Sequence, residues 1–259
     1  MKAVILAAGR GGRLSDVTGA LPKCLARIGA ATLIEHQLTA LFDAGIADVT
    51  VVGGYRSADV RRVCGPRVTM VNNERFASTN SLYSLWLARD ILRDGFLVLN
   101  CDVLFHPQLL HDLLTARYDD ALLMAARGDA TYSDEEMKVC VRAGRVVDLA
   151  KTIDSADADG ENVGIAKFGA DGARVLIDEL NRLVTSGALR AWLPEAFAAF
   201  SRRRPLHVVE TRGFPWIEID FPEDYWQACA HVLPAIETDA SASHRRPVAA
   251  ASGRTRHHV

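Results

Sequence analysis

Short apolar runs alternate with amphipathic segments through the first half of the chain. The runs are typical of buried strands and predict strands at residues 3–7, 49–52, 68–71, 96–99 and 121–125. The segments between them place apolar residues at helical spacing and predict helices at residues 32–44, 57–64, 80–92 and 107–116. Because each crossover helix packs back against one face of a sheet, this alternation predicts a doubly wound α/β sheet with parallel strands.

The pattern changes after residue 126, where strand patterns follow one another without helices between them. Residues 138–141, 144–151 and 163–168 predict an antiparallel lobe lying over the sheet. Mixed elements then return, with helices predicted at 171–184, 191–203 and 222–233 and strands at 206–210 and 216–219.

The composition changes again at Pro234. Residues 234–259 are rich in Ala, Ser, Pro and Arg and contain almost no large apolar side chain, so we expect a disordered tail. The folded region is then one domain over residues 1–233, with a first half at 1–125 and a second half at 126–233.

The charges of the chain are balanced, with 30 Lys and Arg, 32 Asp and Glu and a formal net charge of −2. Such a balance gives no overall field that attracts nucleic acid or an anionic membrane, so a small, locally recognised partner is favoured. The 5 cysteines show no C-x-x-C spacing, which disfavours a disulfide framework or a structural zinc site. No apolar run has the length of a signal peptide or a membrane span, so a cytoplasmic protein is expected.

A glycine-rich, basic loop, "LAAGRGGRLSD" at residues 6–16, follows the first predicted strand. Glycines at the carboxyl end of a parallel strand let backbone N–H groups approach an anion. The spacing is not the dinucleotide-binding fingerprint, because Arg13 stands where that motif begins a helix, and no G-K-[ST] marks a P-loop. A tight surface turn with incidental arginines explains this loop alone equally well.

The residues that follow favour anion binding. The stretch "LAAGRGGRLSDVTGALPKCL" resembles the signature of the nucleotidyltransferases that activate phosphorylated sugars and alcohols, L-A-A-G-x-G-x-R-L followed by P-K. The resemblance spans residues 1–230 and is strongest up to Lys23. It implies a single Rossmann-like, doubly wound mixed sheet with an antiparallel acceptor lobe, the nucleotide-diphospho-sugar transferase-like fold. The first half would bind the nucleotide and the second half the acceptor.

In that family the loop wraps the triphosphate of a nucleotide. The resemblance implies that Arg13 neutralises the phosphates and that Lys23 stabilises charge growing at the α-phosphoryl group, so these are the predicted catalytic residues. The nucleotide-binding residues predicted in this region are Leu6, Ala8, Gly9, Gly11, Gly12, Arg13 and Lys23.

Carboxylates at two predicted strand ends suit Mg²⁺. Asp102 follows the apolar run "LVLNC", where the family places a metal ligand, although a turn or helix-cap residue is the competing interpretation. Glu218 and Asp220 in "WIEID" point the same way, because side chains two residues apart lie on one face of a strand. We predict Asp102 and Asp220 as the metal pair, with Glu218 in reserve.

The stretch N-S-x-Y-S at residues 80–84 resembles one branch of the family, the small cytidylyltransferases acting on phosphocholine, 2-aminoethylphosphonate or inositol phosphate. An amphipathic helix with a polar cap explains most of this segment. The branch implies base and ribose contacts from Thr79, Asn80 and Ser81, together with Gly54 and Tyr55. The preference for CTP follows only from this resemblance.

The acceptor side carries weaker signals. Lys151 falls where the sugar-phosphate members place a lysine on the acceptor phosphate, and Lys138 is a second candidate. Glu136 and its acidic neighbours would face an acceptor ammonium, although solvated surface charges explain all of these residues equally well. Three aromatic residues would form a wall for a quaternary ammonium, namely Tyr132, Trp192 and Trp216. Membership of the core is the competing interpretation of these residues.

The resemblance carried by these residues implies a Mg²⁺-dependent cytidylyltransferase that transfers CMP from CTP to a small phosphorylated or phosphonylated alcohol and releases pyrophosphate. A sugar-1-phosphate or inositol-phosphate nucleotidyltransferase would share the loop and the metal pair, and a catalytically silent nucleotide-binding regulatory module would share the fold. A glycosyltransferase is less favoured, because "NCDVLF" offers one Asp rather than D-x-D. No nucleic-acid or membrane partner is expected, and a homodimer is compatible with the sequence.

Overall fold

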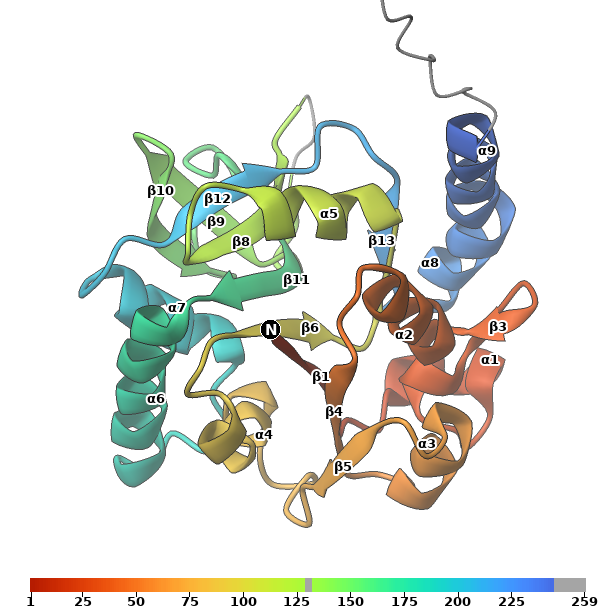
Figure 1. Ribbon diagram of the computed structural model, residues 1–259, viewed down its shortest axis with the longest axis horizontal. Coiled ribbons are helices and arrows are strands. Elements are labelled where there is room, and N and C mark those ends of the chain that lie inside the picture. Colours follow the sequence, from red (N-terminus) through yellow and green to blue (C-terminus); the bar gives the residue numbers. More distant parts are fainter. Residues whose placement is uncertain (129–131, 245–259) are drawn as a thin grey trace, which may run out of the picture.

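The computed structural model describes residues 1–128 and 132–244, with side chains as far as Asp239. Its centre is a nine-stranded sheet in the order β5-β4-β1-β6-β11-β8-β12-β10-β9 (Figure 1). The first four strands of this order are parallel, as predicted, and comprise β1 (Lys2–Ala7), β4 (Asp48–Gly53), β5 (Thr69–Asn72) and β6 (Phe96–Asn100).

Helices cover both faces of the sheet, which confirms the doubly wound prediction. Alternate residues of β1 point to opposite faces, so Ala3 and Ile5 join one buried cluster while Val4 and Leu6 join another. The first cluster receives side chains from α2 (Leu33–Asp43), α3 (Ser57–Cys64) and α5 (Pro107–Thr115). The second receives them from α4 (Ser81–Leu87), α6 (Ala170–Thr185) and α7 (Leu193–Ser201) (Figure 1).

The second half of the chain extends the same sheet. Its strands are β8 (Ala121–Ala126), β9 (Lys138–Arg142), β10 (Arg145–Ala150), β11 (Gly160–Phe168) and β12 (His207–Glu210). β11 runs antiparallel to both β6 and β8, and its first residues also pair with β9. The prediction of a lobe lying over the sheet is therefore wrong in that respect, because these strands hydrogen-bond into the sheet and curl back to β11.

Several short elements escaped prediction because two or three residues carry no periodic signal. They include the hairpin of β2 (Arg27–Ile28) and β3 (Ala31–Thr32) and the strand β7 (Val103–Phe105). β7 pairs with β13 (Trp216–Glu218), which falls within the strand predicted at 216–219. The β7–β13 pair matters most, since its register sets Glu218 opposite Val103, beside the end of β6. The remaining short helices are η1 (Gly12–Leu14), α1 (Ser15–Thr18), η2 (Lys23–Leu25) and η3 (Arg89–Ile91).

The chain continues through α8 (Pro222–Gln227), a π-helical turn (Ala228–Val232) and α9 (Leu233–His244). The start of the predicted disordered tail at Pro234 is therefore wrong, because Leu233 and Ile236 are buried against Ile28 and Ile219 and anchor α9. Residues 245–259, where the rest of that prediction falls, lie outside the described residues. Within the described ranges, no helix combines the length and apolarity that crossing a membrane requires.

Candidate active site

A cavity of about 340 Å³ opens at the carboxyl ends of β1 and β6, where the two halves of the chain meet. This edge is the usual ligand site of an open α/β sheet. Most of the predicted site residues line it, namely Leu6, Ala8, Gly9, Gly11, Gly12, Arg13, Lys23, Thr79, Asn80, Ser81, Asp102, Lys151, Glu218 and Asp220.

The glycine-rich loop is shaped by close contact with Lys23. Gly11 has φ +65°, and a Cβ atom there would lie 2.6 Å from Cβ of Lys23, so only glycine fits this turn. Leu14, which is fully buried with Leu104 and Ile219, fixes the other end of the loop. The loop therefore presents Arg13 and Lys23 to the cavity from a rigid base.

Lys23 bridges two acidic residues that come from distant parts of the sequence. Its Nζ lies 2.9 Å from Oδ2 of Asp102 and also donates to Oδ1 of Asp220, while Arg13 Nη2 lies 2.7 Å from Oδ2 of Asp220. The three side chains of this bridge are 14–20% exposed, so water screens their charges only in part. The predicted catalytic cations and metal ligands thus form one network.

Burial and charge act in opposite directions on the ionisable groups of this network. Burial opposes the charge of Lys23, but Asp102 and Asp220 outweigh it and raise the pKa of Lys23. Burial also opposes the charge of Asp220, but Lys23 and Arg13 hold the pKa of that carboxyl below its ordinary value. In contrast, burial and then the carboxylates of Asp102 and Asp220 raise the pKa of Glu218 well above its ordinary value.

The acidic side chains fit a divalent metal ion. One oxygen from each of Asp102, Glu218 and Asp220 lies within 4.8 Å of the others. Oδ1 of Asp102 is buried and has no hydrogen-bond partner among the described residues, so one ligand atom is available. An all-oxygen, carboxylate-rich set suits Mg²⁺ rather than a soft metal.

Gln37, which sequence reasoning missed, fixes the turn that carries Asp102. It is 1% exposed, and its Nε2 donates to the carbonyl oxygens of Asn100 and Val103 at 2.8 Å each. These two residues bracket Asp102, so the helix α2 holds the end of β6 in place. A lone Gln on an amphipathic helix gives no sequence signal for such a role.

Asp220 is held by the residues that begin α8. Its backbone N–H donates to Oδ2 of Asp224 at 2.9 Å, and that of Phe221 donates to the same oxygen at 2.8 Å. Asp224, in the first turn of α8, thus accepts from the backbone that enters the helix and fixes the position of Asp220. The Phe221 ring in turn supports Arg13, whose guanidinium carbon lies 4.5 Å from the ring centroid.

On the nucleotide side, Asn73 organises the polar entry to α4. This side chain is 1% exposed, and its Nδ2 donates to Oγ1 of Thr79 at 3.0 Å and to Oγ of Ser84 at 3.1 Å. Oδ1 of Asn80 accepts from the N–H of Ser81, so the amide nitrogen of Asn80 remains to face a ligand. Asn73 was not predicted, because it follows a short strand with no motif around it.

Gly54 and Tyr55 lie outside the lining of this cavity. A Cβ atom on Gly54 would lie 2.7 Å from the carbonyl oxygen of Ala8, and the N–H of Tyr55 donates to that oxygen at 3.0 Å. The Tyr55 hydroxyl donates to the carbonyl of Ala20 at 3.1 Å. These contacts support the glycine-rich loop from behind, because they involve its backbone rather than the open space in front of it.

The acceptor side contributes Lys151 and Trp192 to the cavity. Nζ of Lys151 lies 5.5 Å from the centroid of the Trp192 ring and 3.3 Å from Oε2 of Glu135. Of the three proposed wall residues, Trp192 lines the cavity, whereas Trp216 packs within the β13–β7 pair and Tyr132 is not part of the described lining.

Lys138 and Glu136, the other two predicted acceptor residues, do not belong to the lining of this cavity. Lys138 is 2% exposed and donates to the carbonyl oxygen of Lys151 at 2.6 Å, while Glu136 accepts from the hydroxyl of Ser133 at 2.6 Å. The bond from Lys138 holds the backbone of Lys151 directly after β10, whereas Glu136 bonds within its own loop. Nearby, burial and the charge of Glu136 raise the pKa of Glu161 to about 7, against the opposing effect of Lys138.

The strand order of the mixed sheet is that of the nucleotide-diphospho-sugar transferase fold. The charged glycine-rich loop and the acidic strand ends share one cavity, and together with the fold they define a nucleotidyltransferase. Residues 3–193 match the MobA-like NTP transferase domain, and the chain belongs to this family.

Relatives and solved structures agree with that class. Choline-phosphate cytidylyltransferase of Streptococcus pneumoniae is 30% identical over 190 residues, 64% of this chain and 80% of that protein. 2-aminoethylphosphonate cytidylyltransferase of Lancefieldella rimae is 30% identical over 118 residues, 41% of this chain and 47% of that protein. The inositol-1-phosphate CTP transferase from T. maritima shares the fold, with TM-score 0.74 and 22% identity over 91% of this chain and 96% of that chain.

Proposed function

We propose that this chain transfers CMP from CTP to a small phosphorylated or phosphonylated alcohol and releases pyrophosphate. The observation that carries the proposal is the network in which Lys23 joins Asp102 to Asp220 in the same cavity as Lys151. This arrangement supports the binding of a nucleoside triphosphate next to a cation that would face the acceptor. Relatives named for CTP and for phosphocholine or a phosphonate support this choice of substrates.

CTP would lie along the first half of the chain. Its triphosphate would follow the glycine-rich loop, where Gly9 and Gly12 border the cavity and a Cβ atom built on either would meet no described atom within 4 Å, which leaves room for a phosphate. Its base would lie against the start of α4, with the amide of Asn80 as a donor for the pyrimidine carbonyl. The Asn73 network would hold this slot in shape.

The reaction needs positioning and charge neutralisation rather than a nucleophilic side chain. An oxygen of the acceptor's phosphoryl or phosphonyl group attacks the α-phosphorus of CTP in line, forming a P–O–P bond as the bond to the β-phosphate oxygen breaks. The electron pair of that broken bond leaves with pyrophosphate. Lys23, whose pKa is raised, and Arg13 would stay charged and stabilise the negative charge on the phosphoryl oxygens.

Asp102 and Asp220 would hold Mg²⁺, with Glu218 as a third ligand, because a bound cation would favour the charged form of a carboxyl whose pKa burial and the neighbouring carboxylates raise. The bound ion would supply positive charge to the triphosphate and order its oxygens. The unpartnered Oδ1 of Asp102 is the feature of the site that fits this role best.

The acceptor would enter beside Lys151 and Trp192. The ammonium of Lys151 would pair with the phosphoryl group, and the aromatic face of Trp192 suits an ammonium or trimethylammonium group, so this surface favours a small zwitterion.

The location of the chain is a separate part of the proposal. The five cysteines are free thiols, in keeping with the proposed cytoplasmic location.

A pyrophosphate-release assay tests the proposal. Each of the four ribonucleoside triphosphates is paired with phosphocholine, 2-aminoethylphosphonate, inositol phosphate and glucose 1-phosphate, with and without Mg²⁺. We expect release only with CTP, only with Mg²⁺, and fastest with an aminated acceptor. Release that is fastest with a hexose phosphate would assign the chain to the sugar nucleotidyltransferases instead.

A further inference from the structure

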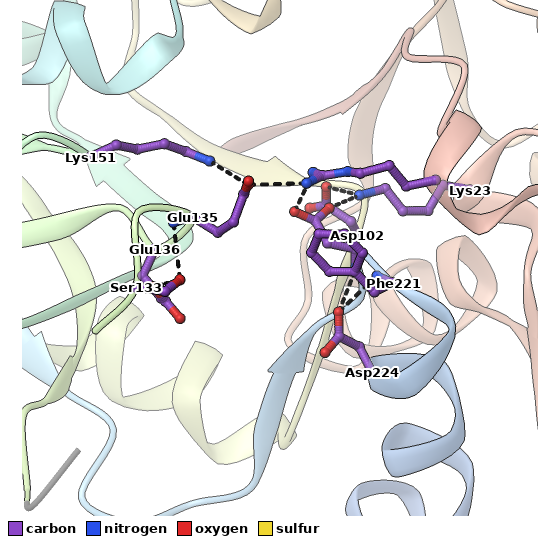
Figure 2. A network of polar contacts seen from close by, with 10 residues as sticks. Lys23, Asp102, Ser133, Glu135, Glu136, Lys151, Phe221 and Asp224 are labelled. Carbon is purple, nitrogen blue, oxygen red and sulfur yellow. Dashed lines mark hydrogen bonds and ion pairs between the residues drawn. The ribbon is translucent and has the colours of Figure 1, made fainter. Parts of the chain in front are cut away.

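One carboxylate oxygen in the cavity contacts cations from both halves of the chain. Oε2 of Glu135 accepts from Nη1 of Arg13 at 3.0 Å and from Nζ of Lys151 at 3.3 Å. Figure 2 shows Glu135 reaching from its loop to the space between Lys151 and the side chains around Lys23. Arg13 belongs to the glycine-rich loop and Lys151 follows β10, so this oxygen closes the space between the nucleotide side and the acceptor side.

Each cation has support that does not depend on Glu135. The guanidinium of Arg13 lies over the Phe221 ring and pairs with Asp220, and the ammonium of Lys151 lies over the Trp192 ring. Removing Glu135 would therefore leave two cations already aimed at one point. Two cations that converge on one oxygen form the geometry by which proteins bind a phosphoryl oxygen.

The charge of the network explains why Glu135 has to move. Among the described residues, the cations Arg13, Lys23 and Lys151 contact the carboxylates of Asp102, Asp220 and Glu135, so the network is formally neutral. An anionic substrate gains little from a neutral site. Glu135 is the member that leaves most easily, because its side chain is 54% exposed while those of Asp102 and Asp220 are 18% and 20% exposed.

We infer that Glu135 is an internal competitor for the substrate anion, occupying the position between Arg13 and Lys151 that a phosphoryl or phosphonyl oxygen takes when the acceptor binds. This inference rests on the proposed function for the identity of the acceptor, but the competition itself requires only an anion. Binding is then an exchange of one carboxylate for one phosphoryl group.

The test is direct binding of inorganic phosphate to the full chain at fixed ionic strength without metal or nucleotide, measured by calorimetry. Glu135→Gln keeps the side-chain shape and removes the charge, and Asp134→Asn is the matched control. Asp134 is the preceding, exposed residue, and among the ion pairs of the described chain it contacts neither cation. We expect the Kd of phosphate to fall about 3- to 10-fold in Glu135→Gln and to change less than about 2-fold in Asp134→Asn.

Adding Lys151→Ala to Glu135→Gln should abolish the gain, because the converging cation is lost. A Kd that is unchanged or higher in Glu135→Gln, or lowered equally by Asp134→Asn, would overturn the inference. Because this experiment involves no turnover, it separates the role of Glu135 from the proposed function. If Glu135→Gln binds phosphate more tightly but the wild type does not transfer CMP, only the proposed function is contradicted. CMP transfer with unaltered phosphate binding in Glu135→Gln would contradict only the role of Glu135.

Discussion

The ammonium of Lys23 lies 2.9 Å from Oδ2 of Asp102, although the two residues belong to different elements, η2 and the turn after β6. Because Gly11 has no side chain, the glycine-rich loop can pack directly against Lys23. Gln37 holds the turn that carries Asp102 through hydrogen bonds to its backbone. The pair thus joins the glycine-rich loop to the acidic strand ends. Changing either residue should affect the chemistry more than the fold.

Asp102→Asn should lower kcat by about 100-fold or more, because the amide loses the charge that holds a divalent ion. The fold should persist, since Asp220 still pairs with Lys23 and Arg13. Pyrophosphate release measures kcat, and the paramagnetic signal of Mn²⁺ measures metal binding without turnover. Asp48→Asn, which alters an exposed carboxylate paired with Lys2, is the control. Near-normal turnover of Asp102→Asn at saturating Mg²⁺ would contradict the metal assignment.

Lys23→Ala should lower kcat by about 100- to 1,000-fold while the Kd of CTP changes far less, because its charge matters most as charge grows at the α-phosphorus. Single-turnover kinetics and equilibrium binding of CTP separate the two effects. If the variant weakens CTP binding and leaves kcat intact, Lys23 is a ground-state contact of the triphosphate instead.

From the sequence, the glycine-rich loop and Asp102 were placed in one site through their resemblance to a family motif, and Asp220 through its position two residues after Glu218 on a predicted strand. The structure brings the three together through Lys23. The sequence also predicted the doubly wound half, because its strand and helix segments are long enough to show the hydrophobic periodicity of each element. Gln37, Asn73 and Glu135 could not be found this way, since their roles arise from contacts made across 63, 11 and 122 positions of the chain respectively. The placement of β9 and β10 within the main sheet depends on strand pairing that no local pattern specifies.

Lys151→Ala should raise the KM of the acceptor about 10- to 150-fold and that of CTP little, because a charge-assisted contact to the phosphoryl group is worth about 1.5–3 kcal/mol. Steady-state kinetics with each substrate varied in turn provide the measurement. Lys2→Ala, at a partly exposed ion pair at the amino end of β1, opposite the end that borders the cavity, controls for the loss of one positive charge. Equal effects on both substrates would place Lys151 outside the acceptor site.

Glu161→Gln should stabilise the protein at high pH but not at low pH. The pKa of Glu161 is raised to about 7 in the folded chain from its ordinary value of about 4.5. The folded chain therefore binds more protons than the unfolded chain between pH 4.5 and 7, and its stability falls as the pH rises through this range. The amide removes this penalty, which should amount to on the order of 1–2 kcal/mol above pH 7 for a partly buried group. Urea unfolding at pH 5 and pH 8 measures the difference. A stability gain that is the same at both pH values would show that Glu161 titrates normally.

Phosphorus NMR of the complete reaction tests the central claim most directly. The chain is incubated with CTP, Mg²⁺ and either phosphocholine or 2-aminoethylphosphonate, and the products are followed over time. The account predicts that pyrophosphate and a CMP-linked product, with two coupled phosphorus signals, appear in equal amounts while CTP is consumed. Failure of both acceptors to give such a product, together with its formation from CTP and glucose 1-phosphate, would contradict the account.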